Sequence, residues 1–367
     1  MTRTDILIVG GGPAGLATAI AASRRGFRVT VADGRRPPID KACGEGLMPD
    51  ALAAAGRLGV SIPAEESFLF RGVRFLGADG EAATASFPRG FGMGVRRTAL
   101  HALLVEQAER AGVDLRWGDP VTGMDTGIVW TRTETFRAQW VIGADGGQSR
   151  ARTWAGLAGC SRDVRRFGFR RHYRITPWTN YVEVYWGRSF QIYVTAVAPE
   201  EVCVALISRN AQLRLDDVLG RFPELKAKLA GAEQMTNERG AITATRRLCA
   251  VFRGRVALVG DASGSVDAIT GEGVGVALQQ ALALVDAIER ERLDEYAQAH
   301  RRIARRPTFM ADFMLLMDRW PVLQNRALEV FARRPDIFAR LVAMHVGQLP
   351  VFDFAAASFG LAWRMLL

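Results

Sequence analysis

The chain of 367 residues is predicted to adopt an α/β fold with a second, antiparallel sheet, and three observations predict it. An apolar run at 6–9 is followed by a glycine-rich turn, an alanine- and leucine-rich helix at 14–25 and a β-branched strand at 28–32. An apolar strand that stops at glycine returns at 140–145 and again at 255–264. Between these last two segments, strands with alternating aromatic and polar residues indicate an antiparallel sheet.

The first turn has the spacing G-x-G-x-x-G at Gly10, Gly12 and Gly15. Gly10 allows the sharp turn, Gly12 lets a pyrophosphate approach the backbone, and Gly15 lets the helix pack closely on the strand. Asp33 ends the second strand, where a carboxylate accepts a hydrogen bond from a ribose 2′-hydroxyl. This βαβ unit predicts a Rossmann-type site for FAD or NAD rather than NADP.

Composition narrows the class of protein further. The chain is 49% hydrophobic and 23% charged, which is typical of a globular protein. A net charge of +10 suits nucleic acid, an anionic membrane or phosphate-bearing cofactors, and arginine doublets spread along the chain favour the cofactors over nucleic acid. The four cysteines (Cys43, Cys160, Cys203 and Cys249) form no C-x-x-C pair, so we expect a cytoplasmic protein without a structural metal. Residues 1–5 are polar, and no signal peptide is expected.

The segment after Asp33 is predicted to be a loop that continues to 49. Gly34 and Arg35 begin it, and two prolines prevent a continued strand. Glycines on both sides of Glu45 would let the backbone approach a flat ligand, although an ordinary connecting loop explains them equally well. A short alanine-rich helix is expected at 50–56.

Short strands with glycine turns are expected at 68–87, as a β-rich insertion. An amphipathic helix follows from Arg97 and ends at Gly112, and strands are predicted at 113–117 and 128–130. The strand at 140–145 ends with Asp145 followed by Gly146.

The middle strands, at 181–186, 191–195 and 202–207, predict an antiparallel sheet with one covered face. Such a sheet would make a wall for an apolar substrate, although alternating aromatic residues are more often plain core. His172 lies in this region and is the one histidine with a plausible role as an acid or base.

The last segment with a nucleotide-binding pattern is 255–264, where Gly260 and Asp261 follow a strand that is expected to be buried. Asp261 could accept a hydrogen bond from a polyol hydroxyl. The glycine loop 270–275 opens a helix at 277–290, and its amides would meet the other end of the ligand.

Four motifs in this order resemble the glutathione-reductase-like FAD-binding fold of flavin-dependent aromatic hydroxylases, geranylgeranyl reductases and flavin halogenases. They are the glycine turn with Asp33, the Arg97 helix start, Asp145-Gly146 and Gly260-Asp261, and the resemblance covers about residues 4–290. It implies that the cofactor-binding residues are Gly10, Gly12, Pro13, Ala14, Gly15, Asp33, Gly34, Arg35, Cys43, Gly44, Arg97, Asp145, Gly146, Gly260, Asp261, Gly271, Gly273 and Val274. NAD(P)H would visit transiently as the electron donor.

The branch within this group stays open. Many hydroxylases resemble one another in having a histidine where this chain has Gly264 and a proline where it has Ala268. The pair Cys43-Gly44 is similar to the corresponding residues of the prenyl-reductase branch. The stretch 44–49 is similar to the Gly-Glu-x-x-x-Pro loop of halogenases and some polyketide-modifying hydroxylases. The Trp-x-Trp-x-Ile-Pro signature of halogenases is absent.

The resemblance implies an FAD-dependent monooxygenase that hydroxylates a lipophilic aromatic or polyketide-like small molecule of secondary metabolism through a flavin C4a-hydroperoxide. The alternative enzyme is an FAD-dependent prenyl or alkene reductase, in which Cys43 would be the proton donor. A flavin-binding ligand carrier without turnover is the alternative outside enzymes. The candidate catalytic side chains are Cys43, Glu45 and His172.

The sequence predicts a discontinuous FAD-binding domain at 1–66, 92–166 and 250–300, a substrate-binding sheet at 67–91 and 167–249, and a C-terminal helical region at 301–367. Apolar helices are expected at 307–317 and 351–367, both too short or too charged to cross a membrane. They could pack on the body, cover a long substrate or attach the protein to a membrane surface. The oligomeric state stays open.

Overall fold

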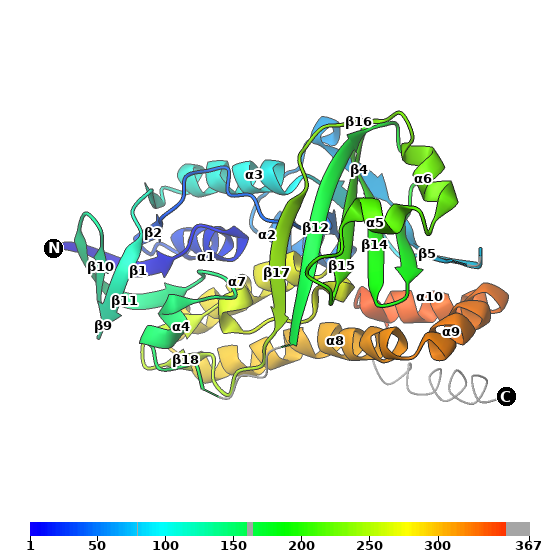
Figure 1. The fold of residues 1–367 in the computed structure, drawn as a ribbon. Coiled ribbons are helices and arrows are strands. Elements are labelled where there is room, and N and C mark those ends of the chain that lie inside the picture. Colours follow the sequence, from blue (N-terminus) through cyan, green and yellow to red (C-terminus); the bar gives the residue numbers. More distant parts are fainter. Residues whose placement is uncertain (79, 160–163, 350–367) are drawn as a thin grey trace.

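The computed structural model describes residues 1–78, 80–159 and 164–349. Cys160 and the helix expected at 351–367 lie outside these residues. Figure 1 shows an α/β part that contains the N-terminus, a second sheet beside it, and a long helix, α8, that runs along the base of both. The α/β fold with an added sheet and C-terminal helices confirms the fold class predicted from the sequence.

The first sheet has eight strands within the described residues, five of them parallel. Their order is β19 (Val256–Leu258), β11 (Thr135–Gly143), β1 (Thr2–Val9), β2 (Val29–Asp33) and β8 (Asp114–Trp117), with β18 (Phe252–Arg253), β9 (Val121–Asp125) and β10 (Ile128–Thr131) added antiparallel. Val9 pairs with Gly143, which pairs with Leu258. The turns after β1, β11 and β19 therefore meet at one edge of the sheet.

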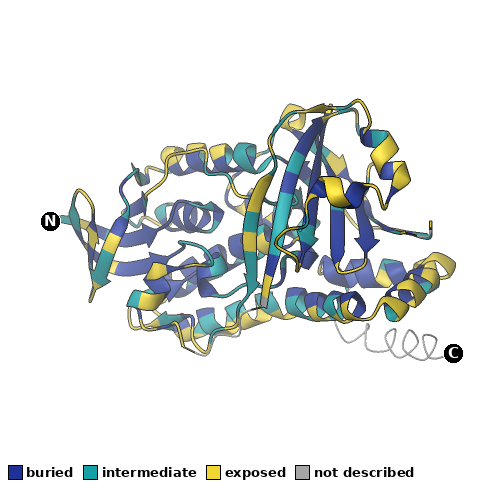
Figure 2. Ribbon diagram, viewed as in Figure 1, coloured by how far each residue is buried: buried dark blue, intermediate teal, exposed yellow. Residues whose placement is uncertain are grey.

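Helices cover both faces of this sheet. One face carries α1 (Pro13–Ser23), α2 (Pro49–Arg57), α3 (Arg97–Arg110) and α7 (Gly273–Glu289), and the other carries the short α4 (Arg150–Trp154). Ile8, Leu16 and Leu278 are fully buried between the sheet and the helices. Figure 2 shows most of the central strands β1 and β2 and the inner sides of the helices as buried. The continuous apolar runs predicted at the strands thus reflect burial on two faces.

A small antiparallel sheet of β3 (Gly46–Leu47), β7 (Gly92–Val95) and β4 (Ser67–Phe70) joins the two parts. It holds the end of the loop 34–46 against the strand that leads into α3. Of the short strands expected at 68–87, β4 therefore pairs here, and β5 (Gly72–Gly77) and β6 (Ala82–Ser86) pair in the second sheet.

The second sheet also has eight strands within the described residues. Their order is β16 (Glu233–Gln234), β12 (Val164–Arg174), β15 (Glu201–Ser208), β14 (Phe190–Ala198), β13 (Val182–Gly187), β5 and β6, with β17 (Arg239–Thr245) paired to β12. The sheet is antiparallel as expected except for the parallel pair β13 and β5. The sequence did not mark β12 as a strand because its buried positions include Arg166 and Arg170.

Both faces of the second sheet are covered, so the expectation of one covered face is wrong. α5 (Leu215–Leu219) and α6 (Pro223–Leu229) pack on one face, and α8 (Leu293–Arg319), α9 (Pro321–Arg333) and α10 (Pro335–His345) pack on the other. The apolar stretch expected at 307–317 is the second half of α8, and its Met310, Met314 and Met317 are buried against the sheet. Among the described residues, no helix combines the length and apolar character needed to cross a membrane.

Candidate active site

A cavity of about 1350 Å³ lies where the carboxyl edge of the first sheet meets the second sheet. Its wall includes every residue predicted to bind the cofactor except Gly15. These lining residues are Gly10, Gly12, Pro13, Ala14, Asp33, Gly34, Arg35, Cys43, Gly44, Arg97, Asp145, Gly146, Gly260, Asp261, Gly271, Gly273 and Val274. The tertiary structure therefore collects four separate motifs around one space.

The glycines of the β1–α1 turn have different roles. Gly10 has a φ of +109°, and a Cβ atom there would lie 2.6 Å from the carbonyl oxygen of Ala144. A Cβ atom on Gly15 would lie only 1.9 Å from the carbonyl oxygen of Gly10, which explains why Gly15 packs behind the turn and not in the cavity. A Cβ atom on Gly12 would have no neighbour within 4 Å. Gly10 and Gly15 thus allow close packing, and Gly12 leaves open space at the helix N-terminus.

Asp33 fixes this turn from the end of β2. Its Oδ2 accepts a hydrogen bond from the Gly11 amide at 2.7 Å, and its Oδ1 accepts one from the Arg35 amide at 2.8 Å. His101 of α3 holds the same turn from the other side, with Nε2 2.9 Å from the carbonyl oxygen of Gly11. Burial lowers the pKa of His101, so a neutral ring donates this hydrogen bond. No role was predicted for His101, because its partner is a backbone atom 90 residues away.

Asp145 and Gly146 line the cavity below α4. Asp145 Oδ2 accepts hydrogen bonds from the amides of Arg150 and Ala151, at 2.7 and 3.0 Å. Its Oδ1 is buried and has no hydrogen-bond partner among the described residues. Asp145 therefore positions α4 with one oxygen and leaves the other for a ligand.

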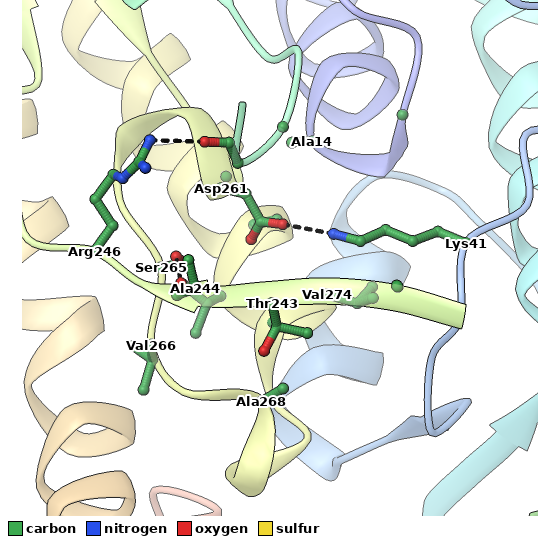
Figure 3. Close-up of a pocket in the computed structure, with 18 of the residues that line it drawn as sticks. Ala14, Lys41, Thr243, Ala244, Arg246, Asp261, Ser265, Val266, Ala268 and Val274 are labelled. Carbon is green, nitrogen blue, oxygen red and sulfur yellow. Dashed lines mark hydrogen bonds and ion pairs between the residues drawn. The ribbon is translucent and has the colours of Figure 1, made fainter. Parts of the chain in front are cut away.

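Asp261 faces a lysine that the sequence did not single out. Figure 3 shows the side chains of Asp261 and Lys41 pointing toward one another, and Lys41 Nζ lies 2.9 Å from Asp261 Oδ2. Arg246 comes from the end of β17 and donates a hydrogen bond to the carbonyl oxygen of Gly147 at 2.8 Å. Lys41 is one of 48 lysine and arginine residues, and nothing in the sequence distinguishes it from the others, because its partner Asp261 lies 220 positions away.

The loop before α7 presents backbone to the same cavity. Gly271 has a φ of +70°, and a Cβ atom on Gly271 or Gly273 would meet nothing within 4 Å. α7 starts at Gly273, so its first amides and the positive end of its dipole lie at the cavity wall. Asp267 accepts a hydrogen bond from the Ile269 amide at 3.1 Å and shapes the short helical turn before this loop.

These residues fit an elongated dinucleotide such as FAD. Two open glycine positions line the cavity, at Gly12 and at Gly273, each at the start of a helix. Arg97 Nε is buried in the wall without a hydrogen-bond partner among the described residues. A ligand with phosphates and hydroxyl groups would satisfy such groups.

The three candidate catalytic residues lie in two different places in the structure. Cys43 lines the cavity, whereas Glu45 and His172 do not contribute to its wall and lie buried together. Glu45 Oε2 is 2.6 Å from His172 Nε2, and Glu45 Oε1 accepts hydrogen bonds from Arg170 at 2.8 Å and from the Arg97 amide at 2.9 Å. Burial raises the pKa of Glu45, but the hydrogen bond to His172 and the charge of Arg170 outweigh it and lower the pKa.

Glu45 also has a φ of +59°, a rare backbone conformation for a residue with a side chain. Its buried hydrogen bonds hold the loop in this conformation, directly beside Cys43 and Gly44. Cys203 joins the same cluster, and the ligand atoms of Glu45, His172 and Cys203 lie within 4.8 Å of one another. The Arg170 guanidinium already neutralises Glu45, so the cluster is better suited to positioning the loop than to binding a cation.

The second sheet supplies an apolar part of the cavity wall. The side chains that contribute are Phe169, Tyr193, Leu206, Ile207 and Ile242, with Leu315 from α8. Tyr193 donates a hydrogen bond to the carbonyl oxygen of Ile269 at 2.6 Å, which ties this wall to the loop before α7. The predicted apolar substrate wall therefore adjoins the predicted cofactor site.

Comparison with known proteins agrees with this geometry. The model of the family described as FAD binding domain matches residues 3–308. The menaquinone reductase of Mycolicibacterium smegmatis is 27% identical over 329 residues, which are 81% of this chain and 79% of the relative. A digeranylgeranylglycerophospholipid reductase of Thermoplasma volcanium is 26% identical over 76% of each chain.

A para-nitrophenol 4-monooxygenase of Pseudomonas sp. strain WBC-3 is 24% identical over 89% of this chain and 90% of the relative. The crystal structure of the p-nitrophenol 4-monooxygenase PnpA from Pseudomonas putida DLL-E4 superposes with a TM-score of 0.80, covers 97% of this chain and 99% of that chain, and is 18% identical, so it shows a shared fold. With a family match over most of its length, the chain belongs to the FAD binding domain family and is an FAD-dependent oxidoreductase.

Proposed function

We propose that the protein is an NAD(P)H-dependent FAD monooxygenase that hydroxylates a lipophilic aromatic or polyketide-like small molecule. The observation that carries the proposal is the single cavity, which runs from the dinucleotide-binding turn at Gly12 to the apolar face formed by Tyr193 and Leu206. This arrangement would place a lipophilic substrate beside the cofactor and away from water.

The relatives include enzymes of both kinds. The alignment with the para-nitrophenol 4-monooxygenase spans 89% of this chain at 24% identity, compared with 81% at 27% for the menaquinone reductase and 76% at 26% for the digeranylgeranylglycerophospholipid reductase. That monooxygenase is named for para-nitrophenol, a phenol, and we propose an aromatic substrate for this chain as well.

Within this proposal, residues of the chain bind the cofactor, orient the substrate and shield both from water. Gly12 and Asp33 would hold the pyrophosphate and adenosine ribose of FAD, and Lys41 with Asp261 would hold the middle of the cofactor. The amides at Gly271 and Gly273 would stabilise negative charge at the start of α7. Bound FAD would supply the transfer of two electrons from NAD(P)H to dioxygen, one oxygen atom of which would enter the substrate while the other leaves as water.

The proposal also divides the chain. Residues 1–66, 92–166 and 250–300 would form the FAD-binding domain, 67–91 and 167–249 the substrate-binding sheet, and 301–367 a C-terminal helical region.

Exposed Leu316, Trp320 and Val322 at the α8–α9 corner are consistent with peripheral contact of the C-terminal helical region with a membrane that holds a lipophilic substrate.

Reduction of a prenyl or other alkene is the second candidate function, and the position of Cys43 favours it. Its side chain belongs to the cavity wall, and the Glu45 amide donates a hydrogen bond to Cys43 Sγ at 3.4 Å. A thiol held in this way could give a proton to one carbon of an alkene while hydride reaches the other. Two of the relatives are named as reductases.

One experiment separates the two functions. Purified holoprotein is incubated with NADPH or NADH, ¹⁸O-labelled dioxygen and a panel of phenolic polyketides and prenyl alkenes, and the products are analysed by mass spectrometry. Incorporation of one labelled oxygen atom into a substrate supports the monooxygenase. Gain of two hydrogen atoms without oxygen, with equal yield under anaerobic conditions, shows the reductase instead.

A further inference from the structure

A buried polar cluster lies behind the loop that presents Gly271 and Gly273 to the cavity. Its centre is Glu272, the residue between these two glycines, whose side chain is 6% exposed. α2 contributes Asp50, α8 contributes Arg306, and α10 contributes His345. The cluster therefore joins the cofactor loop to the C-terminal helices.

Arg306 is shared unequally between two carboxylates. Its closest contact is Asp50, with which it forms a hydrogen-bonded ion pair, and Gln279 donates a second hydrogen bond to the same oxygen of Asp50 at 3.1 Å. Glu272 Oε1 lies 3.7 Å from Arg306 Nη2, beyond hydrogen-bonding distance. Asp50 thus neutralises most of the charge of Arg306, and Glu272 is the acid left over.

His345 is the remaining neighbour of Glu272. Its Nδ1 lies 3.4 Å from Glu272 Oε2, and neither atom has a hydrogen-bond partner among the described residues. The ring also faces the backbone of Thr270, at the start of the same loop. Two uncharged groups can occupy this buried position, whereas an ionised Glu272 would have as its nearest cation Arg306, 3.7 Å away and already hydrogen-bonded to Asp50.

Ionisation equilibria agree with this geometry. Burial raises the pKa of Glu272 to about 8, against the opposing charge of Arg306. Burial lowers the pKa of His345 to about 4, and the charge of Arg306 acts in the same direction. The α7 dipole favours an ionised Glu272, but by less than the cost of desolvating a carboxylate.

We propose that Glu272, buried beside His345 behind the cofactor loop, is a neutral carboxylic acid when the cavity holds its anionic ligand. A neutral Glu272 leaves the positive end of α7 available to negative charge in the cavity. An ionised Glu272 would place a carboxylate at that same helix end and weaken the binding of an anion. The inference holds for either of the two reactions, because it concerns the holoprotein before substrate binds.

The first test is infrared spectroscopy of the holoprotein at pH 6.5. We expect a carbonyl stretch of a buried protonated carboxyl group that is present in the wild-type protein and absent from Glu272→Gln. An unchanged spectrum in the variant overturns the proposal. Since this readout follows one carboxyl group and not turnover, it is independent of the assigned reaction.

The second test follows the FAD dissociation constant against pH by fluorescence. In the wild-type protein the constant should rise about 2- to 5-fold through pH 8, and in Glu272→Gln it should stay at its low-pH value. The same rise in both proteins overturns the proposal. Glu289→Gln is the matched control, because Glu289 lies at the other end of α7 and pairs with Arg25 on the surface. It should keep the wild-type profile.

Asp50→Asn keeps the test decisive if Glu272→Gln does not fold. Removal of the Asp50 charge frees Arg306 for Glu272, so the rise in the dissociation constant should move to a lower pH. An unmoved rise overturns the proposal, because Glu272 would then not depend on the shared arginine. A carboxyl band that disappears at lower pH in Asp50→Asn than in the wild-type protein would support it.

Discussion

At the scale of single residues, the three glycines of the β1–α1 turn differ in the atoms that surround each Cα atom. Gly15 has the backbone of Gly10 against it, and Gly12 has open cavity. The same motif thus contains one position that maintains the fold and one that faces the ligand.

Gly12→Val should give a folded but colourless protein. The φ of −74° at Gly12 suits any residue, and the added side chain would occupy the space predicted for the pyrophosphate. Absorbance of the purified protein and its unfolding curve without FAD measure the two effects. Gly15→Ala is the contrast, because overpacking against Gly10 should destabilise the fold by about 1–3 kcal/mol. Full flavin content in Gly12→Val would contradict the assignment.

Cys43→Ala tests whether the thiol takes part in the reaction. For the proposed monooxygenase, turnover should stay within a few-fold of wild type, because a small side chain in the wall does not react. Loss of turnover with flavin still bound would favour the alkene reductase. Rates of flavin reduction by NADPH, measured separately, exclude an effect on the first half-reaction.

Glu272 should also make stability depend on pH. Its pKa is raised from the ordinary 4.5 to about 8 by burial, so the folded protein keeps a proton that the unfolded chain loses between these values. The stability from this proton is fully present below pH 4.5 and is lost as the pH rises through about 8. Glu272→Gln has no such loss.

The difference in unfolding free energy between Glu272→Gln and wild type should therefore grow from pH 5 to pH 8, by at most about 1.4 kcal/mol per pH unit. Urea unfolding at several pH values measures it. A difference that does not change with pH would show that Glu272 is already ionised in the folded protein.

At the scale of elements, a buried ionic cluster connects β12, α8 and the loop before α7. Arg166 is fully buried, with Nε 3.0 Å from Asp267 Oδ2 and Nη2 2.9 Å from Asp318 Oδ2. Gln191 of β14 donates a further hydrogen bond to Asp318 at 2.9 Å. One strand therefore fixes both the long helix and the loop that leads to the cofactor.

Arg166→Met should destabilise the protein by about 3–5 kcal/mol, because it removes the closest cation of two buried carboxylates and leaves Asp318 with the more distant Arg209, 3.7 Å away. Arg247→Met is the matched control, since Arg247 pairs with Asp312 of the same helix where both side chains are more than 60% exposed. Its cost should be about 0–1 kcal/mol. Urea unfolding of both variants measures the two changes in unfolding free energy. Equal changes would show that burial of the Arg166 ion pairs does not increase their contribution to stability.

At the scale of the whole molecule, the charge of +10 gathers in part around the cavity. The basic residues of its wall are Arg35, Lys41, Arg97, Arg150, Arg165, Arg239, Arg246, Arg247, Arg301 and Arg305. Acidic residues also line the wall but are fewer, so the cleft carries a net positive charge, which attracts anionic ligands over long distances.

The association rate of FAD with the apoprotein should therefore fall as salt is added, while dissociation changes little. Stopped-flow fluorescence at increasing sodium chloride measures both rates. Screening shortens the range of the attraction to about 8–10 Å at physiological ionic strength, which removes long-range steering first. A salt-independent association rate would mean that the basic residues act only after contact.

The sequence by itself determined the parts whose signal is local. The β1–α1–β2 unit, the strands that stop at Asp145 and Asp261, and the glycine loop at 271–273 are encoded in runs of a few residues each. β12 was missed because its inward arginines reverse the usual pattern of an amphipathic strand. The covered second face of the second sheet was missed because the covering helices come from a distant part of the chain.

Only the tertiary structure decided which polar groups meet. Lys41 finds Asp261 at a separation of 220 residues, and Glu45 finds His172 at 127. It also placed Cys43 in the cavity and Glu45 behind it, and it set His345 against Glu272. Strands and turns follow from short-range sterics and hydrophobic periodicity, whereas the partner of a buried charge depends on how the whole chain packs.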